Sequence, residues 1–162
     1  MAETLATTDM LPTQFEPLAK RRFLFAIEGI DSFIVKAASR PTYTTEEVAI
    51  PWINSTRYLA GKTTFGTLSV TLHDPIAPAG SQQVMEWIRL TTETVSGRSG
   101  YADFYKRDIQ IKMLDPVGTV VQLWDLKGSW LTEANFNDLA YDGSDTTEIA
   151  LTIRFDNAVL QF

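Results

Sequence analysis

Cysteine is absent from the sequence and histidine occurs only once, and both shortages narrow the chemistry that the chain can carry out. Without cysteine there is no disulfide framework and no thiolate ligand for a metal. The one histidine, His73, stands beside Asp74, and no serine lies in a context typical of a nucleophile. The carboxylates are dispersed singly rather than at the spacing of a metal site. We therefore expect no catalytic residue, no cofactor and no metal, and a protein that is not an enzyme.

Long apolar runs and a surplus of basic residues are also missing. No apolar segment approaches the roughly 18 residues that a membrane-spanning helix needs, and the N-terminal residues lack the basic and apolar regions of a secretory signal. The formal net charge is −6, which argues against tight binding to a phosphate backbone, because neutralising phosphates supplies most of that affinity. We therefore expect assembly in a cytoplasm and no specific nucleic-acid binding.

Two segments match a nucleotide-binding or catalytic motif only in part. Gly61-Lys62-Thr63 resembles the end of a phosphate-binding loop, but the glycine required five residues earlier is Thr56 and no helix is expected to follow. The segment from Gly97 to Tyr101 lacks the final glycine of a nucleophile elbow. Neither segment therefore predicts nucleotide binding or hydrolysis.

The chain of 162 residues fits one domain preceded by a polar segment. Residues 1–21 contain Pro12 and Pro17, show no hydrophobic periodicity and are predicted to form a flexible N-terminal arm. Residues 22–162 are predicted to form a single domain.

Short runs with two-residue periodicity predict a mainly β protein. In Thr67–His73, for example, Leu68, Val70 and Leu72 share one face. Asp115-Pro-Val-Gly118 has the residues of a type I turn, which predicts a hairpin between the strands on either side. Strands are predicted at residues 23–27, 33–37, 46–50, 67–73, 108–113, 119–124 and 148–155.

One helix is predicted among these strands. Val84, Trp87, Ile88 and Thr91 recur at helical spacing within residues 83–92, and Ser81 is positioned to cap this helix. The expected fold class is therefore mainly β (α+β), an antiparallel β-sandwich or partial barrel with one flanking α-helix.

Two further segments show no clear period. Residues 130–141 are predicted to be irregular. The segment from Pro51 to Gly61 is predicted to be a long loop, although Trp52 and Tyr58 are costly to expose to water. This loop either folds back onto the core or docks on a partner.

The order of these segments resembles one protein family. The resemblance rests on Arg40-Pro41, on the stretch from Ile50 to Lys62, on the strand ending in His73-Asp74, and on the helix residues 84–88. It continues through Gly100-Tyr-Ala-Asp-Phe-Tyr-Lys-Arg107, the turn at residues 115–118 and Ile153-Arg-Phe-Asp-Asn157. Together, over Phe23 to Phe162, these segments are similar to the tail tube proteins of T-even-like contractile bacteriophages.

That resemblance implies a virion structural protein of the phage tail, assembled in the cytoplasm of the host bacterium. Six copies would form a ring whose inner strands join into one continuous β-barrel, and the rings would stack into a tube for DNA ejection. The implied partners are further copies of the chain, the contractile sheath protein, baseplate tube-initiation proteins, and the tape-measure protein and passing DNA in the lumen. As an assembly, the tube would pierce the host envelope.

Candidate assembly residues follow from this family and from the polar strand faces. The candidates for contacts between rings are Trp52, Ile53, Asn54, Arg57, Tyr58 and Leu59. The candidates for the lumen, which is expected to be polar and mostly acidic or neutral, are Thr67, Ser69, Thr71, Asp108, Gln110, Glu148 and Thr152. Alternation defines two faces of a strand, but not which of them points inward.

Three alternative functions compete with the tube subunit of a phage tail. The nearest is a tube subunit of a genome-free contractile injection device, such as a tailocin. A monomeric β-sandwich that binds a ligand would instead remain monomeric at high concentration. A hydrolase would need the catalytic residues whose absence is described above.

Overall fold

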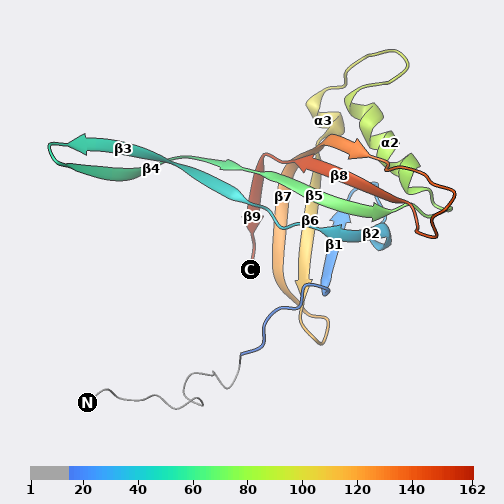
Figure 1. Cartoon of the computed structure of the whole chain (residues 1–162), viewed down its shortest axis with the longest axis horizontal. Helices are drawn as coiled ribbons and strands as arrows, with labels where there is room; N and C mark the ends of the chain where they lie inside the picture. Colours follow the sequence, from blue (N-terminus) through green and yellow to red (C-terminus); the bar gives the residue numbers. More distant parts are fainter. Residues whose placement is uncertain (1–14) are drawn as a thin grey trace.

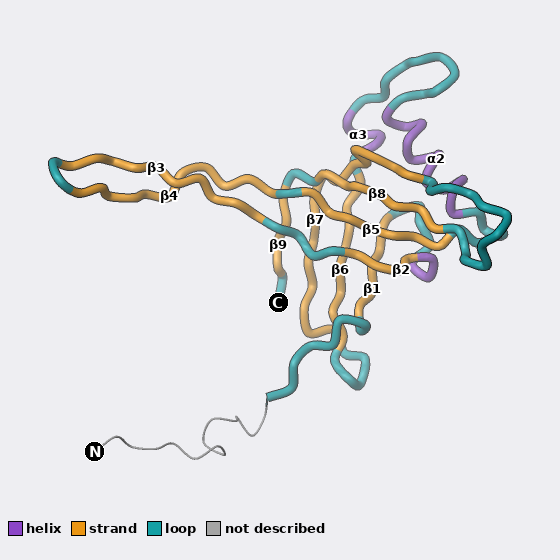
Figure 2. Tube along the Cα trace, in the orientation of Figure 1, coloured by secondary structure: helices purple, strands orange, loops and turns teal. Residues whose placement is uncertain are grey.

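Two layers of antiparallel strands form the body of the protein, and one long strand belongs to both (Figures 1 and 2). The computed structural model describes residues 15–162. The first layer, called the β6 layer, contains β1 (Phe23–Ile27), β6 (Arg107–Leu114), the first half of β7 (Val120–Asn135) and β9 (Asn157–Leu160). The second, called the β5 layer, contains the second half of β7, β8 (Glu148–Arg154), β5 (Thr67–His73) and β2 (Val35–Ala38).

β7 passes from one layer to the other at a glycine. Gly128 has a φ of +65°, and a Cβ at this position would lie 2.2 Å from Oδ2 of Asp156. Only glycine adopts this backbone conformation without strain, and here it also leaves room for the neighbouring carboxylate. The bend lets β7 pair with β6 up to Ser129 and with β8 from Trp130 onward.

The core lies between the two layers, where their apolar faces meet. β5 and β8 contribute alternate residues from one side, and β1 and β6 contribute alternate residues from the other. The buried core side chains of these four strands are Leu68, Val70, Leu72, Ile149, Leu151, Ile153, Phe25, Ile27, Ile109 and Ile111. The predicted mainly β fold with a flanking helix is confirmed.

The helices close one end of this core. α2 (Gly80–Thr91) buries Val84 and Trp87, and the short α3 (Ala102–Tyr105) follows after a connecting loop. The predicted cap was wrong, because Ser81 lies inside the helix. Its backbone N–H and its hydroxyl both donate to the carboxylate of Asp74, at 3.0 and 2.5 Å, so that carboxylate binds one of the free N–H groups of the first turn.

The segment from Pro51 to Gly61 is not a loop. It belongs to a hairpin of β3 (Tyr43–Trp52) and β4 (Ser55–Phe65), which pair in register from Tyr43 opposite Phe65 to Trp52 opposite Ser55. The hairpin extends away from the body along the line of β5 (Figures 1 and 2). Only its base contacts the core, through Phe65 at the end of β4. The predicted strand at residues 46–50 lies within β3, whereas β4 was not predicted, because a hairpin without a buried face need not alternate apolar and polar residues.

Smaller differences occur at two other elements. Phe33 and Ile34 lie in the 3₁₀ helix η1 (Ser32–Ile34), which shortens the predicted strand to β2. β7 continues to Asn135, so the predicted irregular segment begins at residue 136 rather than 130. The turn at Asp115 is confirmed, since its Oδ1 accepts hydrogen bonds from the backbone N–H groups of Val117 and Thr119.

Part of the predicted N-terminal arm, residues 1–14, lies outside the described residues. Residues 15–21 contain neither helix nor strand. Among the residues that the structure describes, no helix is long and apolar enough to cross a membrane.

Candidate assembly interfaces

The exposed face of the β5 layer is rich in hydroxyl groups. Ser69 stands opposite Thr152 and Thr71 opposite Ala150, while the residues between them point into the core. Thr132 on β7 donates its hydroxyl to the backbone carbonyl of Thr152, at 3.0 Å. The face therefore presents short polar side chains in adjacent rows, which is the pattern that strand alternation predicts for a solvated sheet face.

Charges on this face are balanced. Arg154 lies opposite Thr67, and Glu133 lies opposite Thr152. At the other end of β8, the carboxylate of Glu148 pairs with the ammonium group of Lys36 on β2. With two basic and two acidic side chains, the face is close to neutral, although the whole chain carries a net charge of −6.

The β5 layer has two free edges. β2 pairs only with β5, and the second half of β7 pairs only with β8 among the described residues. Beyond β2, the N–H of Ser39 still donates to the carbonyl of Ser69, at 2.8 Å, so the backbone stays extended along this edge. Free edges leave rows of unpaired N–H and C=O groups, which need a partner or protection.

The structure divides the candidate lumen residues between two opposite faces. Thr67, Ser69, Thr71, Glu148 and Thr152 all lie on the exposed face of the β5 layer. Asp108 and Gln110 lie on the exposed face of the β6 layer, on the far side of the core. One lumen cannot be lined by both faces of the same sandwich.

Asp108 takes part in an ion pair on the β6 layer. Its carboxylate accepts a hydrogen bond from Nζ of Lys127 at 2.7 Å, which holds the pKa of Asp108 below its ordinary value and raises the pKa of Lys127. Both side chains are more than half exposed, so the pair contributes little to stability. The pair shows that the exposed face of the β6 layer also carries charged side chains.

All six candidates for contacts between rings lie in the distal half of the β3–β4 hairpin. Register places Leu59 opposite Val48 and Arg57 opposite Ile50, so these four side chains share one face. Tyr58 lies on the other face, opposite Ala49. Trp52 also lies on the first face, beside the turn formed by Ile53 and Asn54.

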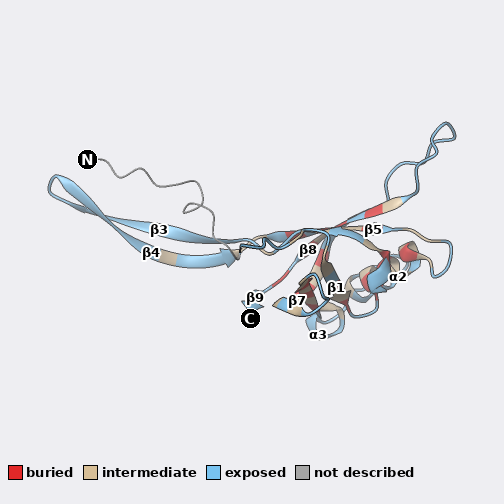
Figure 3. Cartoon of the chain, turned by 90° about the horizontal axis from the view of Figure 1, so that it is seen from below, coloured by how far each residue is buried: buried red, intermediate tan, exposed pale blue. Residues whose placement is uncertain are grey.

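This hairpin leaves large apolar side chains in water. Trp52 is 70% exposed and Ile53 is 92% exposed. Figure 3 shows most of the hairpin as an exposed ribbon outside the body. Contiguous exposed apolar surface of this kind is typical of an interaction site.

The incomplete motifs have structural positions that agree with their exclusion. Gly61, Lys62 and Thr63 lie inside β4, with no helix after them. His73 ends β5 opposite Glu148. Within residues 15–162, no three His, Asp or Glu side chains gather as a potential metal site.

The sequence of the chain is similar to that of a phage tail protein. No protein-family profile matches the chain. The tail tube protein of Serratia phage KSP90 is 27% identical over 123 residues, which cover 74% of this chain and 68% of that protein.

Solved structures share the fold at lower identity. A chain from the tube-terminating cap of the anti-feeding prophage has a TM-score of 0.74 and 16% identity, and the match covers 98% of this chain and 99% of that one. A chain from the sheath–tube complex of the extracellular contractile injection system PVC, in its extended state, has a TM-score of 0.68 and 15% identity, with coverage of 98% and 99%. The chain is a homologue of a phage tail tube protein and shares its fold with subunits of contractile injection systems.

Proposed function

We propose that the chain is the structural subunit of the inner tube of a contractile phage tail, and that six copies close into a ring. The observation that carries this proposal is the β5 layer, which combines a near-neutral hydroxyl-rich face with two free strand edges. Such a sheet can pair at both edges with neighbouring copies and expose its polar face to the water in the bore of a tube.

Ring closure would join the free edge of β2 in one copy to the free edge of the second half of β7 in the next. Main-chain hydrogen bonds across this joint would satisfy the unpaired groups of both edges, as closure does in any β-barrel. The lumen would then be lined by the exposed face of β2, β5, β8 and the end of β7.

In this arrangement Thr67, Ser69, Thr71 and Thr152 face the bore, together with the paired carboxylate of Glu148. Asp108 and Gln110 face outward. The lumen is therefore neutral rather than acidic, and most of the excess negative charge lies elsewhere on the subunit. A wall without a surplus of cations does not bind phosphates, so DNA passes without release of counterions and without adhesion.

The outward β6 layer and the helices are the surfaces available to a contractile sheath. Baseplate tube-initiation proteins would contact the ends of the tube, and a tape-measure protein would occupy the bore before DNA does. The hairpin residues Trp52 to Leu59 would make the contacts between rings. The role is structural throughout, and we assign no catalytic residue.

A genome-free injection device is the alternative role. The likeness in fold to subunits of the anti-feeding prophage and of PVC favours it, whereas the sequence relative belongs to a phage. DNA inside purified particles, or genes for a capsid and terminase beside this gene, would distinguish the two roles.

Negative-stain microscopy of the purified protein, alone and with baseplate initiation proteins, tests the proposal. Hollow rings or tubes are expected. Monomers at high concentration in both samples would contradict the proposal and favour a ligand-binding domain.

A further inference from the structure

The loop between β7 and β8, residues 136–147, is both acidic and apolar. It contains Asp138, Asp142 and Asp145 but no lysine or arginine. Leu139 is 82% exposed, and Tyr141 is fully exposed. We call this segment the acidic loop. Three like charges beside exposed apolar side chains are unfavourable in isolation, so the loop has the character of an unoccupied interface.

The start of the acidic loop is held in place. Asn137 has a φ of +55°, its backbone N–H donates to Oδ1 of Asn135, and its side-chain amide donates to the carbonyl of Glu148, both at 2.9 Å. The loop therefore presents its side chains from a fixed point beside the end of β8.

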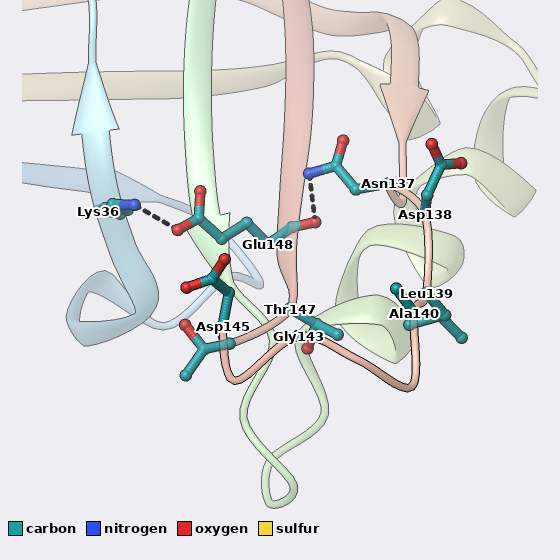
Figure 4. A pocket seen from close by; sticks show the side chains of 10 residues that line it. Lys36, Asn137, Asp138, Leu139, Ala140, Gly143, Asp145, Thr147 and Glu148 are labelled. Carbon is teal, nitrogen blue, oxygen red and sulfur yellow. Dashed lines mark hydrogen bonds and ion pairs between the residues drawn. The ribbon is translucent and has the colours of Figure 1, made fainter.

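A cavity of about 700 Å³ opens between this loop and β2. Figure 4 shows Asp145 on the side of Glu148 and Asp138 on the side of Asn137. Among the described residues, Lys36 is the only basic one that lines the cavity, and its ammonium group is already paired with Glu148. The cavity therefore has two carboxylates, of Asp138 and Asp145, without an ion-pair partner among the described residues.

The tip of the β3–β4 hairpin, residues 50–59, has the complementary character. Arg57 is its only charged residue. Trp52 and Leu59 share the hairpin face of Arg57, Ile53 lies in the turn, and all three are exposed apolar side chains. An arginine fork surrounded by apolar surface is well suited to carboxylates that are themselves beside apolar side chains.

The two surfaces lie at opposite ends of the long axis of the molecule (Figure 1). A single copy therefore cannot bring its hairpin tip to its own acidic loop. Contact between unlike surfaces of two copies is heterologous, and such contacts propagate from one copy to the next. The partner that fits is a second copy of this chain.

We propose that the hairpin tip of each copy docks on the acidic loop of a copy in the adjacent ring, with Arg57 facing Asp138 and Asp145. Trp52 and Ile53 then pack against Leu139 and Tyr141. This inference rests on the proposed tube function and adds the receiving surface to it.

The strand direction explains why the contact joins different rings. The hairpin continues the line of β5, and strands in a closed barrel are tilted by about 35–45° to the barrel axis. The 11 residues of β4 extend about 36 Å, so the hairpin leaves its own ring with a large axial component. The acidic loop joins β7 to β8 at the end of the β5 layer that is farthest from the hairpin. It therefore faces the ring on the opposite side from the ring that the hairpin reaches.

Charge reversal tests the pairing. Arg57→Glu alone, and Asp138→Lys with Asp145→Lys alone, should each raise the protein concentration needed for half-maximal tube formation at least about tenfold. Combining all three substitutions should restore most of that loss. Arg98→Glu, on the exposed loop between α2 and α3, is the matched control and should leave assembly unchanged.

Crosslinking tests the geometry, since the chain has no cysteine of its own. Ser55→Cys with Ala140→Cys places one thiol in each surface and leaves the aromatic side chains intact. Oxidised tubes should give a ladder of covalent oligomers that extends beyond six copies, whereas either single variant should give no ladder.

A ladder that ends at six copies would place the contact within one ring and overturn the proposal. So would tubes that show no crosslink, or charge reversals that leave assembly unchanged, and in these cases the tube function itself would stand. If the wild-type protein forms no tube even with baseplate initiation proteins, the proposed function fails instead.

Discussion

The guanidinium carbon of Arg107 lies 4.9 Å from the centroid of the Trp87 ring. One nitrogen of the same guanidinium donates to the carbonyl of Glu28 at 2.5 Å, and the indole N–H of Trp87 donates to the carbonyl of Tyr105 at 2.7 Å. These contacts join α2 and α3 to β6 and to the turn after β1. Burial lowers the pKa of Arg107, but an arginine stays charged at neutral pH.

Replacing Arg107 with methionine should therefore destabilise the subunit. The variant loses a cation–π contact and a charged hydrogen bond, together worth about 1–3 kcal/mol. Urea unfolding of the dilute monomer measures this change. Lys112→Met, on the exposed face of the β6 layer, is the control and should unfold near the wild-type midpoint. An unchanged midpoint for Arg107→Met would show that the stacking is incidental.

The hairpin aromatics should matter for assembly and not for folding. Trp52→Ala with Tyr58→Ala is expected to leave the melting temperature of the monomer unchanged, because both side chains are exposed in the free subunit. Tube formation should weaken strongly, since aromatic anchors in interfaces are worth about 2 kcal/mol or more each when central.

Sedimentation of tubes and thermal melting of the monomer give the two readouts. Tyr101→Ala, another exposed aromatic residue, serves as the control. Normal tubes from a destabilised monomer would assign the hairpin to the folding of the subunit instead.

A proline on the edge of β2 should block ring closure. The N–H of Ser39 points to β5, so by strand alternation the N–H of Ala38 points to the free edge. Ala38→Pro removes that donor and should leave soluble, folded monomers that do not form rings, as size-exclusion chromatography would report.

Ala158→Pro is a closely matched control. Ala158 is also a half-buried alanine packed on the core, on the edge strand β9, and the N–H of Gln161 points to β7. By the same alternation, its own N–H points away from β7. If both variants lose rings equally, the proline harms the fold of the subunit rather than the pairing of β2 with β7 of the next copy.

The turn at Asp115 should make stability depend on pH. Hydrogen bonds from backbone N–H groups, that of Thr119 first, hold the pKa of this carboxyl below its ordinary value. A depressed folded pKa adds stability that is present above the unfolded pKa of about 3.9 and is lost as pH falls through the folded value. Asp115→Asn keeps an acceptor in the turn but removes the titration.

Urea midpoints of both proteins at pH 7, 5 and 3 would test this account. The advantage of the wild type over Asp115→Asn should be constant from pH 7 to 5 and should shrink towards pH 3. A difference that stays constant down to pH 3 would contradict the assigned cause.

Sequence periodicity predicted most of the strands that pack on the core, but in the β3–β4 hairpin it predicted only residues 46–50. β5 and β8 were predicted because one face of each is buried, which selects alternate apolar residues. The β3–β4 hairpin has no buried face, so nothing in its sequence imposes that alternation, and its pairing follows only from the structure. The end of β7 was missed for a related reason, since Gly128 resembles a turn residue but lies at a bend within the strand.

The sequence predicted which residues are polar and exposed on the strands, but not which of them share a face of the protein. The polar residues of β5, β6 and β8 were identified, but Ser69 and Asp108 lie on opposite sides of the core because their strands belong to different layers. Layer membership depends on long-range pairing, which two-residue periodicity does not encode. The cap at Asp74 was missed likewise, because its contact with Ser81 depends on how the chain between them turns.

An electron cryomicroscopy reconstruction of the assembled tube tests the central claim most directly. The account predicts a hollow tube of stacked six-fold rings whose bore is lined by Ser69, Thr71 and Thr152, with Asp108 and Gln110 on the outside. A bore lined by Asp108 and Gln110, or a protein that stays monomeric at high concentration with baseplate components present, would contradict it.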